Sequence, residues 1–117
     1  MLNSDHDRTI LRALAEQIAA IADLPVHRKK ITLWTDLNDL KRTRPLVWIN
    51  EICWHEMDVH GELALQCGDE LAQIAENQLR RQLYQWRHLP ADMVVEPVFY
   101  AQTCRHNSGF GITLEEE

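Results

Sequence analysis

Apolar residues recur at helical spacing near the start of the chain and predict a helix over residues 7–22. Ser4 or Asp5 precedes this run and can cap its first turn, and Pro25 follows its end. The apolar face consists of Ile10, Leu11, Leu14, Ile18 and Ile21. We therefore expect an amphipathic helix that packs against a core.

A second helix is predicted over residues 26–41. Its apolar stripe consists of Ile31, Trp34, Leu37 and Leu40. The basic run at residues 27–30 is unfavourable at the positive end of a helix dipole. We expect these residues to form a solvated face; a later helix start or a partner for the charges are the alternatives.

The strongest helical pattern covers residues 69–88. Gly68 and Asp69 supply its start, and Pro90 follows its end. Its apolar face consists of Leu71, Ile74, Ala75, Leu79, Leu83 and Trp86.

Two apolar runs flank this third helix and are typical of buried strands. They cover residues 46–49, which follow Pro45, and residues 93–100, where Pro97 removes one ladder donor and favours an edge or a bulge. Residues 107–111 predict a turn and residues 112–114 a further short strand. A strand, helix, strand order normally gives parallel strands. We therefore expect an α/β (or α+β) fold, with a helical preface in residues 1–44 and a strand-helix-strand unit in residues 45–117.

Composition narrows the class of protein. A chain of 117 residues with 45% hydrophobic and 26% charged residues matches one globular domain. Its net charge is -6 and its basic residues are scattered, so we expect no nucleic-acid partner. No apolar run is long enough to span a membrane, and the first residues do not resemble a secretion signal. Three cysteines, an odd number without framework spacing, favour a reducing compartment, and we expect a cytoplasmic protein.

The segment CWHEMDVH at residues 53–60 resembles a zinc-protease motif, but its histidines are five residues apart. On a helix, this separation turns His60 roughly 140° away from His55. Only a loop could bring Cys53, His55 and His60 together, with Cys67, Cys104 or His106 completing a tetrahedral site. The simpler interpretation is that both are ordinary loop histidines, and we expect no metal site in this chain.

Other candidate residues lie at the ends of the predicted strands. Cys104, Arg105 and His106 suggest an activated thiol, although a half-buried or surface cysteine is the commoner explanation. Glu96, inside an apolar run, must face solvent or find a partner, so a functional carboxylate and a structural hydrogen bond are both open. Ligands bind at the carboxyl edge of parallel sheets, so residues near the ends of the predicted strands are expected to face a substrate. The candidates are Asn50, Glu51, Trp54, Glu96 and Tyr100. We expect Trp34, Trp48 and Trp86 to be core residues.

Four segments together resemble the N-terminal region of the uroporphyrinogen-decarboxylase-like superfamily, and within it the anaerobic branch grouped with cobamide-dependent methyltransferases. They are residues 33–40 (LWTDLNDL), 43–47 (TRPLV), 91–97 (ADMVVEP) and 108–112 (SGFGI). The resemblance runs from about residue 8 to residue 117. Members of that superfamily form a complete (β/α)8 barrel and are several times longer.

The resemblance implies that this chain is an incomplete portion of such a barrel enzyme, with scaffold and part of a pocket wall but without catalytic residues. Zinc and a corrinoid belong to full-length relatives, and no cofactor is expected in this chain. The residues 50–54 (NEICW) replace the arginine-rich glycine turn of the decarboxylases, which argues against that reaction. An uncovered sheet face also predicts a homo-oligomer, such as a homodimer, or a missing barrel domain as partner.

Two alternatives remain from the residues themselves. One is a free-standing interaction module whose third helix presents Arg80, Arg81, Tyr84 and Arg87 to a partner. The other is a small metal-binding domain that uses the segment from Cys53 to His60.

Overall fold

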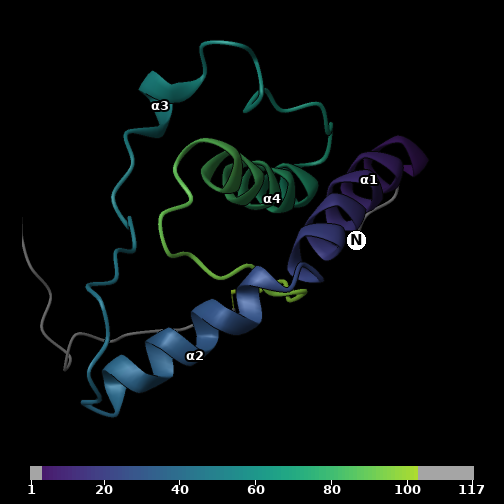
Figure 1. Cartoon of the computed structure of the whole chain (residues 1–117). Coiled ribbons are helices and arrows are strands. Elements are labelled where there is room, and N and C mark those ends of the chain that lie inside the picture. Colours follow the sequence, from purple (N-terminus) through teal and green to yellow (C-terminus); the bar gives the residue numbers. More distant parts are fainter. Residues whose placement is uncertain (1–3, 103–117) are drawn as a thin grey trace, which may run out of the picture.

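The computed structural model describes residues 4–102, and over that range the chain forms four helices and no strand. The helices are α1 (Asp5–Ala22), α2 (Val26–Asn38), α3 (Trp54–Met57) and α4 (Glu70–His88). Figure 1 looks nearly along α4, with α1 beside it, α2 below the pair and α3 carried on long connections. The predicted α/β fold with a strand-helix-strand unit is therefore wrong, and the described chain is helical. The turn and strand predicted after residue 106 lie outside the described residues.

The predicted caps of the first and third helices are confirmed, although α1 begins at Asp5, two residues before the predicted start. The Ser4 hydroxyl accepts the Asp7 N–H at the start of α1, and the Asp69 carboxylate accepts the Ala72 N–H at the start of α4. The second helix begins at Val26 as predicted but ends at Asn38, before the last predicted turn. Leu40 follows it with a φ of 59° and is 94% exposed, so it belongs to no apolar stripe.

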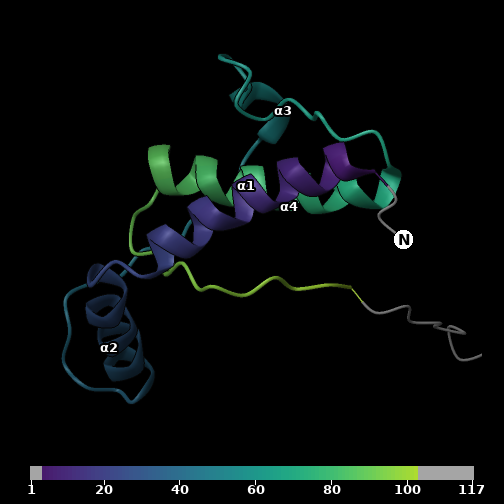
Figure 2. The same cartoon turned by 90° about the vertical axis from the view of Figure 1, so that its right-hand side faces the viewer.

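A small core lies between α1 and α4, which pack against each other and lie side by side in Figure 2. It consists of Leu14, Ile18, Leu79, Leu83, Met93 and Val95. The buried stripe of α4 differs from the predicted one, because Ala72 and Glu76 are buried whereas Leu71 and Ile74 are each about 60% exposed. The predicted stripe was wrong because hydropathy assigns a charged residue such as Glu76 to solvent, whereas Glu76 lies on the buried side of α4.

The start of α2 also differs from the prediction, because His27 is buried rather than solvated. Its Nδ1 accepts the Val95 N–H at 3.2 Å, and its ring packs against Trp86. The Lys30 ammonium donates to the Ala91 carbonyl and lies over the Trp86 ring. The basic run thus anchors the segment that follows α4, while Arg28 and Lys29 stay exposed.

The two segments predicted as strands are extended, but they meet at one residue instead of along a ladder. The Asp92 N–H donates to the Val47 carbonyl, and the Asp92 carboxylate accepts the Val47 N–H, each at 2.9 Å. Asp92 lies just before the second segment, and in residues 4–102 no backbone-to-backbone hydrogen bond joins residues 46–49 to residues 93–100 themselves. Arg44 completes the junction with two hydrogen bonds to the same carboxylate, at 2.6 and 3.1 Å. The side chain of Asp92 therefore occupies the place that a second ladder bond would need.

Two buried carboxylates fix the turn that leads into α4. Asp7 accepts the N–H groups of Gly68 and Asp69, and these hydrogen bonds lower its pKa. Glu76 accepts the N–H groups of Gln66 and Cys67 and a charged hydrogen bond from Arg80. Burial acts to raise the pKa of Glu76, but these three hydrogen bonds outweigh it and the pKa is lowered. The turn is thus tied to both α1 and α4.

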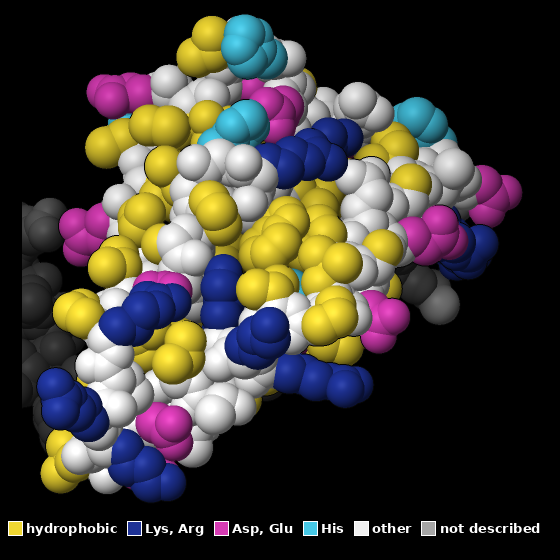
Figure 3. Space-filling view, in the orientation of Figure 1, with side chains coloured by type: hydrophobic (Ala, Val, Ile, Leu, Met, Phe, Trp, Pro, Cys, Tyr) yellow, Lys and Arg dark blue, Asp and Glu magenta, His cyan; other side chains and the backbone are white. Residues whose placement is uncertain are grey.

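The chain leaves much apolar surface uncovered. Its Cα radius of gyration is 18.2 Å, whereas a compact domain of about 100 residues has a radius of about 13 Å. Figure 3 shows apolar side chains gathered over the middle of one face, with Lys and Arg side chains around them. Large apolar residues exposed by more than two fifths include Val47, Trp48, Val98, Phe99 and Tyr100. None of the helices in residues 4–102 has the length and hydropathy needed to cross a membrane.

Candidate functional site

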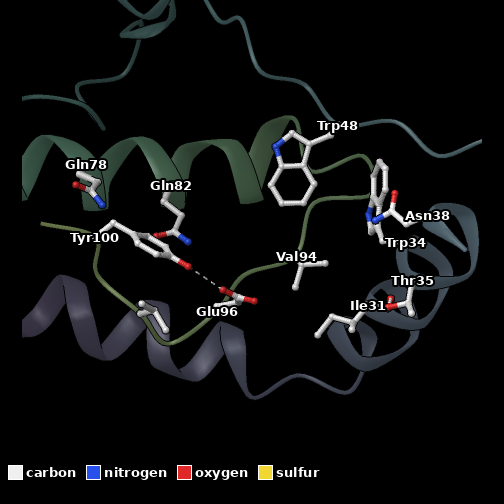
Figure 4. Close-up of a pocket in the computed structure, with 11 residues that line it drawn as sticks. Ile31, Trp34, Thr35, Asn38, Trp48, Gln78, Gln82, Val94, Glu96 and Tyr100 are labelled. Atoms are coloured by element: carbon white, nitrogen blue, oxygen red, sulfur yellow. Dashed lines mark hydrogen bonds between the residues drawn. The ribbon is translucent and has the colours of Figure 1, made fainter. Parts of the chain in front are cut away.

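A groove of about 540 Å³ lies between α2, α4 and residues 94–100. Figure 4 shows the side chains that line it, which come from these three parts of the chain and from Trp48. The lining residues are Ile31, Trp34, Thr35, Asn38, Trp48, Gln78, Gln82, Val94, Glu96, Val98 and Tyr100. Its volume lies in the range of small-molecule sites, and it mixes aromatic and apolar walls with a few polar groups.

The wall formed by residues 93–100 has the alternation of a strand. Val94, Glu96, Val98 and Tyr100 line the groove. Met93 and Val95 point to the core, and Phe99 packs toward Leu11 and Leu79 of the helices on the other side. A period of two residues places successive side chains on opposite faces of an extended chain. The predicted buried strand is therefore wrong, because residues 93–100 are not assigned as a strand in the described chain and residues 96–100 are exposed, although the alternation that suggested it is present.

The backbone of this wall is largely unpaired within residues 4–102. The Val95 N–H donates to His27, and among the described residues no backbone-to-backbone hydrogen bond involves residues 94–100. Extended backbone with open donors and acceptors is a template for another polypeptide segment. This wall can therefore be covered by a further segment without any change in its conformation.

Trp34 and Trp48 form the end of the groove that lies away from Tyr100 (Figure 4). The rings of Trp34 and Trp48 are 6.0 Å apart between centroids and meet edge to face at 64°. The Trp34 indole N–H donates to the Asp92 carbonyl at 2.9 Å, which fixes that ring. Trp48 is 42% exposed. The expectation of core packing therefore fails for Trp48, whereas Trp86 does pack against the core cluster.

Glu96 is the one charged side chain among the residues that line the groove in the described chain. Its carboxylate accepts a hydrogen bond from the Tyr100 hydroxyl at 3.3 Å, drawn as a dashed line in Figure 4. The nearby basic residues are engaged elsewhere, Lys30 with the Ala91 carbonyl and Arg44 with Asp92. The groove thus combines a single negative charge with aromatic surfaces.

Two of the five predicted substrate-facing residues meet in this groove, namely Glu96 and Tyr100. Asn50 and Glu51 are exposed and do not line it. Trp54 lies in α3 and packs edge to face on Tyr84, with Arg81 over its ring at 5.2 Å. The segment CWHEMDVH therefore contributes a one-turn helix that docks on α4, and not a wall of the groove.

The residues suggested as a partner-facing patch on α4 make contacts within the chain. Arg80 donates to Glu76 and to the Glu62 carbonyl, and Arg87 bonds Gln17 and the Glu62 carboxylate. A hydrogen bond from His88 further lowers the pKa of Glu62. These side chains hold the loop before α4 against the helix pair.

The structure gathers no metal ligands in the part of the chain that it describes. No group of three or more His, Cys, Asp or Glu side chains in residues 4–102 is arranged to hold an ion. Cys53, His55 and His60 are all exposed. Burial and the neighbouring Glu76 raise the pKa of the Cys67 thiol to about 12, so this cysteine stays protonated. Cys104, Arg105 and His106 lie outside the described residues.

The sequence held two signals for the groove that hydropathy did not reveal. Ile31, Trp34, Thr35 and Asn38 follow helical spacing and form one face of α2, and Gln78 and Gln82 stand one turn apart on α4. Such mixed faces, with amides beside aromatics, fit a binding wall better than a core. Comparison of the chain with protein-family models, with curated proteins and with solved structures found no match.

Proposed function

We propose that this chain is the N-terminal, non-catalytic part of a uroporphyrinogen-decarboxylase-like or corrinoid-methyltransferase-like protein. In that role it supplies scaffold and part of a pocket wall. The observation that carries the proposal is the extended wall at residues 94–100, whose alternate side chains line the groove while its backbone stays unpaired in the described chain. The resemblance of residues 33–40, 43–47 and 91–97 to that superfamily supports the same role.

The contacts of these resembling segments support a shared structural purpose. Residues 33–40 supply Trp34 and Asn38 to the groove, and residues 91–97 supply Val94 and Glu96. Arg44, in the segment between them, holds Asp92 by a bidentate ion pair. The residues that suggest the family are thus the residues that build and brace the groove. We place the protein in the cytoplasm, in keeping with its unpaired Cys53 and Cys67.

The proposal predicts that the coding sequence continues in frame beyond the codon for Glu117. The continuation should show apolar runs of strand length alternating with amphipathic helices, as a (β/α)8 barrel requires. Sequencing the genomic DNA downstream of that codon tests this directly. An immediate stop codon, with no adjacent gene for a barrel subunit, would contradict the proposal.

The proposal also predicts self-association of the isolated chain, because the apolar wall has no cover within residues 4–102. Light scattering after size-exclusion chromatography should give a mass that is a multiple of 13.7 kDa at micromolar concentration. Replacing Val98, which lines the groove and is 49% exposed, by serine should shift the mass toward one chain. Val59→Ser is the matched control, since Val59 is 76% exposed in the loop after α3. A monomer at all these concentrations would count against an uncovered docking face.

A further inference from the structure

The groove has the chemical features of a site for an organic cation. Its walls offer the rings of Trp34, Trp48 and Tyr100, and its one charge is the carboxylate of Glu96. Aromatic faces attract ammonium groups through their quadrupole, and Trp attracts them more strongly than Tyr. An aromatic wall beside an acidic side chain therefore favours a positive ligand over a neutral or negative one.

The positions of these groups fit a ligand that spans the groove. Figure 4 shows Trp48 on the side of the groove that faces α4, with Glu96 across from it on the extended wall. Tyr100 donates its hydroxyl to Glu96 and so orients the carboxylate without neutralising it. Gln78 and Gln82 offer amide groups from α4 beside the same space. A ligand that enters here meets an aromatic face, a negative charge and neutral hydrogen-bonding groups.

Other classes of ligand fit the groove less well. An anion would meet Glu96 and find no Lys or Arg among the lining residues of the described chain. A metal ion needs several oxygen, nitrogen or sulfur ligands, and residues 4–102 gather no such group. A neutral apolar molecule would pack on the tryptophans but would gain nothing from the carboxylate.

We propose that the groove binds an organic ammonium ion that carries apolar substituents, with Trp48 as its aromatic contact and Glu96 as its counter-charge. This inference rests on the proposed role of the chain as a pocket wall, and it names the class of ligand which that wall recognises. Gln78 and Gln82 supply hydrogen bonds to the polar end of such a ligand.

The test is a titration of the whole chain with choline, compared with dimethylbutanol, a neutral isostere in which carbon replaces the ammonium nitrogen. Binding is followed by the NMR shift of the indole N–H signals. The signal of Trp48 should move, and that of Trp54, which lies in α3 outside the groove, should stay in place. Choline should bind about tenfold more tightly than its isostere, and added salt should reduce the difference.

Two variants locate the charge and the ring. Glu96→Gln should weaken choline binding roughly fivefold and leave the isostere unchanged, because an exposed ion pair contributes modestly. Trp48→Leu should weaken both ligands, and in this variant binding is followed by the indole N–H signal of Trp34, which also lines the groove. Glu56→Gln is the matched control, since Glu56 is an exposed carboxylate of α3. All three positions are well exposed, so these variants should fold.

The outcomes separate this inference from the proposed function. Equal binding of choline and its isostere at Trp48 would overturn the cation site while leaving the groove as a pocket wall. The same conclusion follows if Glu96→Gln has no effect on choline. If neither ligand moves the Trp48 signal at millimolar concentration, the cation site is overturned, whereas the pocket-wall role is decided by the downstream reading frame.

Discussion

Replacement of Glu76 by alanine is expected to lower the free energy of unfolding by about 3 kcal/mol or more, because it breaks a buried ion pair by removing one partner. The Glu76 side chain is fully buried and accepts three hydrogen bonds, from the N–H groups of Gln66 and Cys67 and from Arg80. Alanine would leave two backbone donors and a guanidinium without their acceptor. Since small domains are stable by only about 5–15 kcal/mol, this loss is a large share of the total stability.

The measurement is urea unfolding at neutral pH, followed by far-ultraviolet circular dichroism. Glu76→Gln keeps the shape and one acceptor oxygen, so it should cost less than alanine. Glu16→Ala is the control, because Glu16 is exposed on α1 and its loss should change stability by less than about 0.5 kcal/mol. If the free energy of unfolding of Glu76→Ala were within about 1 kcal/mol of that of the original chain, the turn before α4 would not depend on this carboxylate.

Glu76 also shows why the sequence predicted the helix but not its buried face. Helical spacing and the caps at Ser4 and Asp69 fixed α1 and α4 well, since those signals are local. The burial of a carboxylate depends on donors that arrive from a distant turn, and hydropathy cannot represent them. The predicted buried face therefore included Leu71 and Ile74, which the structure exposes.

The strands were mispredicted for a related reason. The alternation at residues 93–100 is real, and it places Val95 in the core and Glu96 in the groove. A strand, however, also needs a neighbour with matching backbone groups, and sequence periodicity does not say whether one is present. In the described chain, the side chains of His27 and Asp92 take up backbone donors instead.

The candidate site was predicted in part. Glu96 was selected as a carboxylate inside an apolar run and Tyr100 as the residue at its end, and the groove does contain them. Asn50, Glu51 and Trp54 were selected by the same rule at the end of residues 46–49, but without a sheet the two ends do not share an edge. Trp48 was missed because aromatic residues in apolar runs usually indicate a core, whereas here the wall on its other side is open.

Replacement of Asp92 by asparagine is expected to lower the thermal midpoint by roughly 5 °C or more at neutral pH, because the ion pair with Arg44 and one of the two acceptor oxygens are lost. Asp92 is buried and joins Arg44, the Val47 N–H and the backbone of the segment after α4. The guanidinium of Arg44 and the Val47 N–H hold the pKa of Asp92 at about 2, below its ordinary value of 3.8. The native state thus binds the proton of this group less readily than the unfolded chain does.

The lowered pKa of Asp92 determines how the stability of the fold depends on pH. A carboxylate with a lowered folded pKa stabilises the fold above its unfolded pKa, and the contribution is lost as the pH falls through the folded value. The gap in thermal midpoint between the original chain and Asp92→Asn should therefore be constant above about pH 5, narrow below about pH 4 and close near pH 2. Asp36→Asn is the matched control, since Asp36 pairs with Lys41 at 3.7 Å on an open surface and its loss should matter little at any pH. A gap that stays constant down to pH 2, or widens there, would mean that the ion pair with Arg44 does not hold the junction.

The junction also braces the Trp34 indole, because the Asp92 carbonyl accepts the indole N–H. The same variant should therefore broaden the Trp34 indole N–H signal while the signal of Trp54 stays sharp.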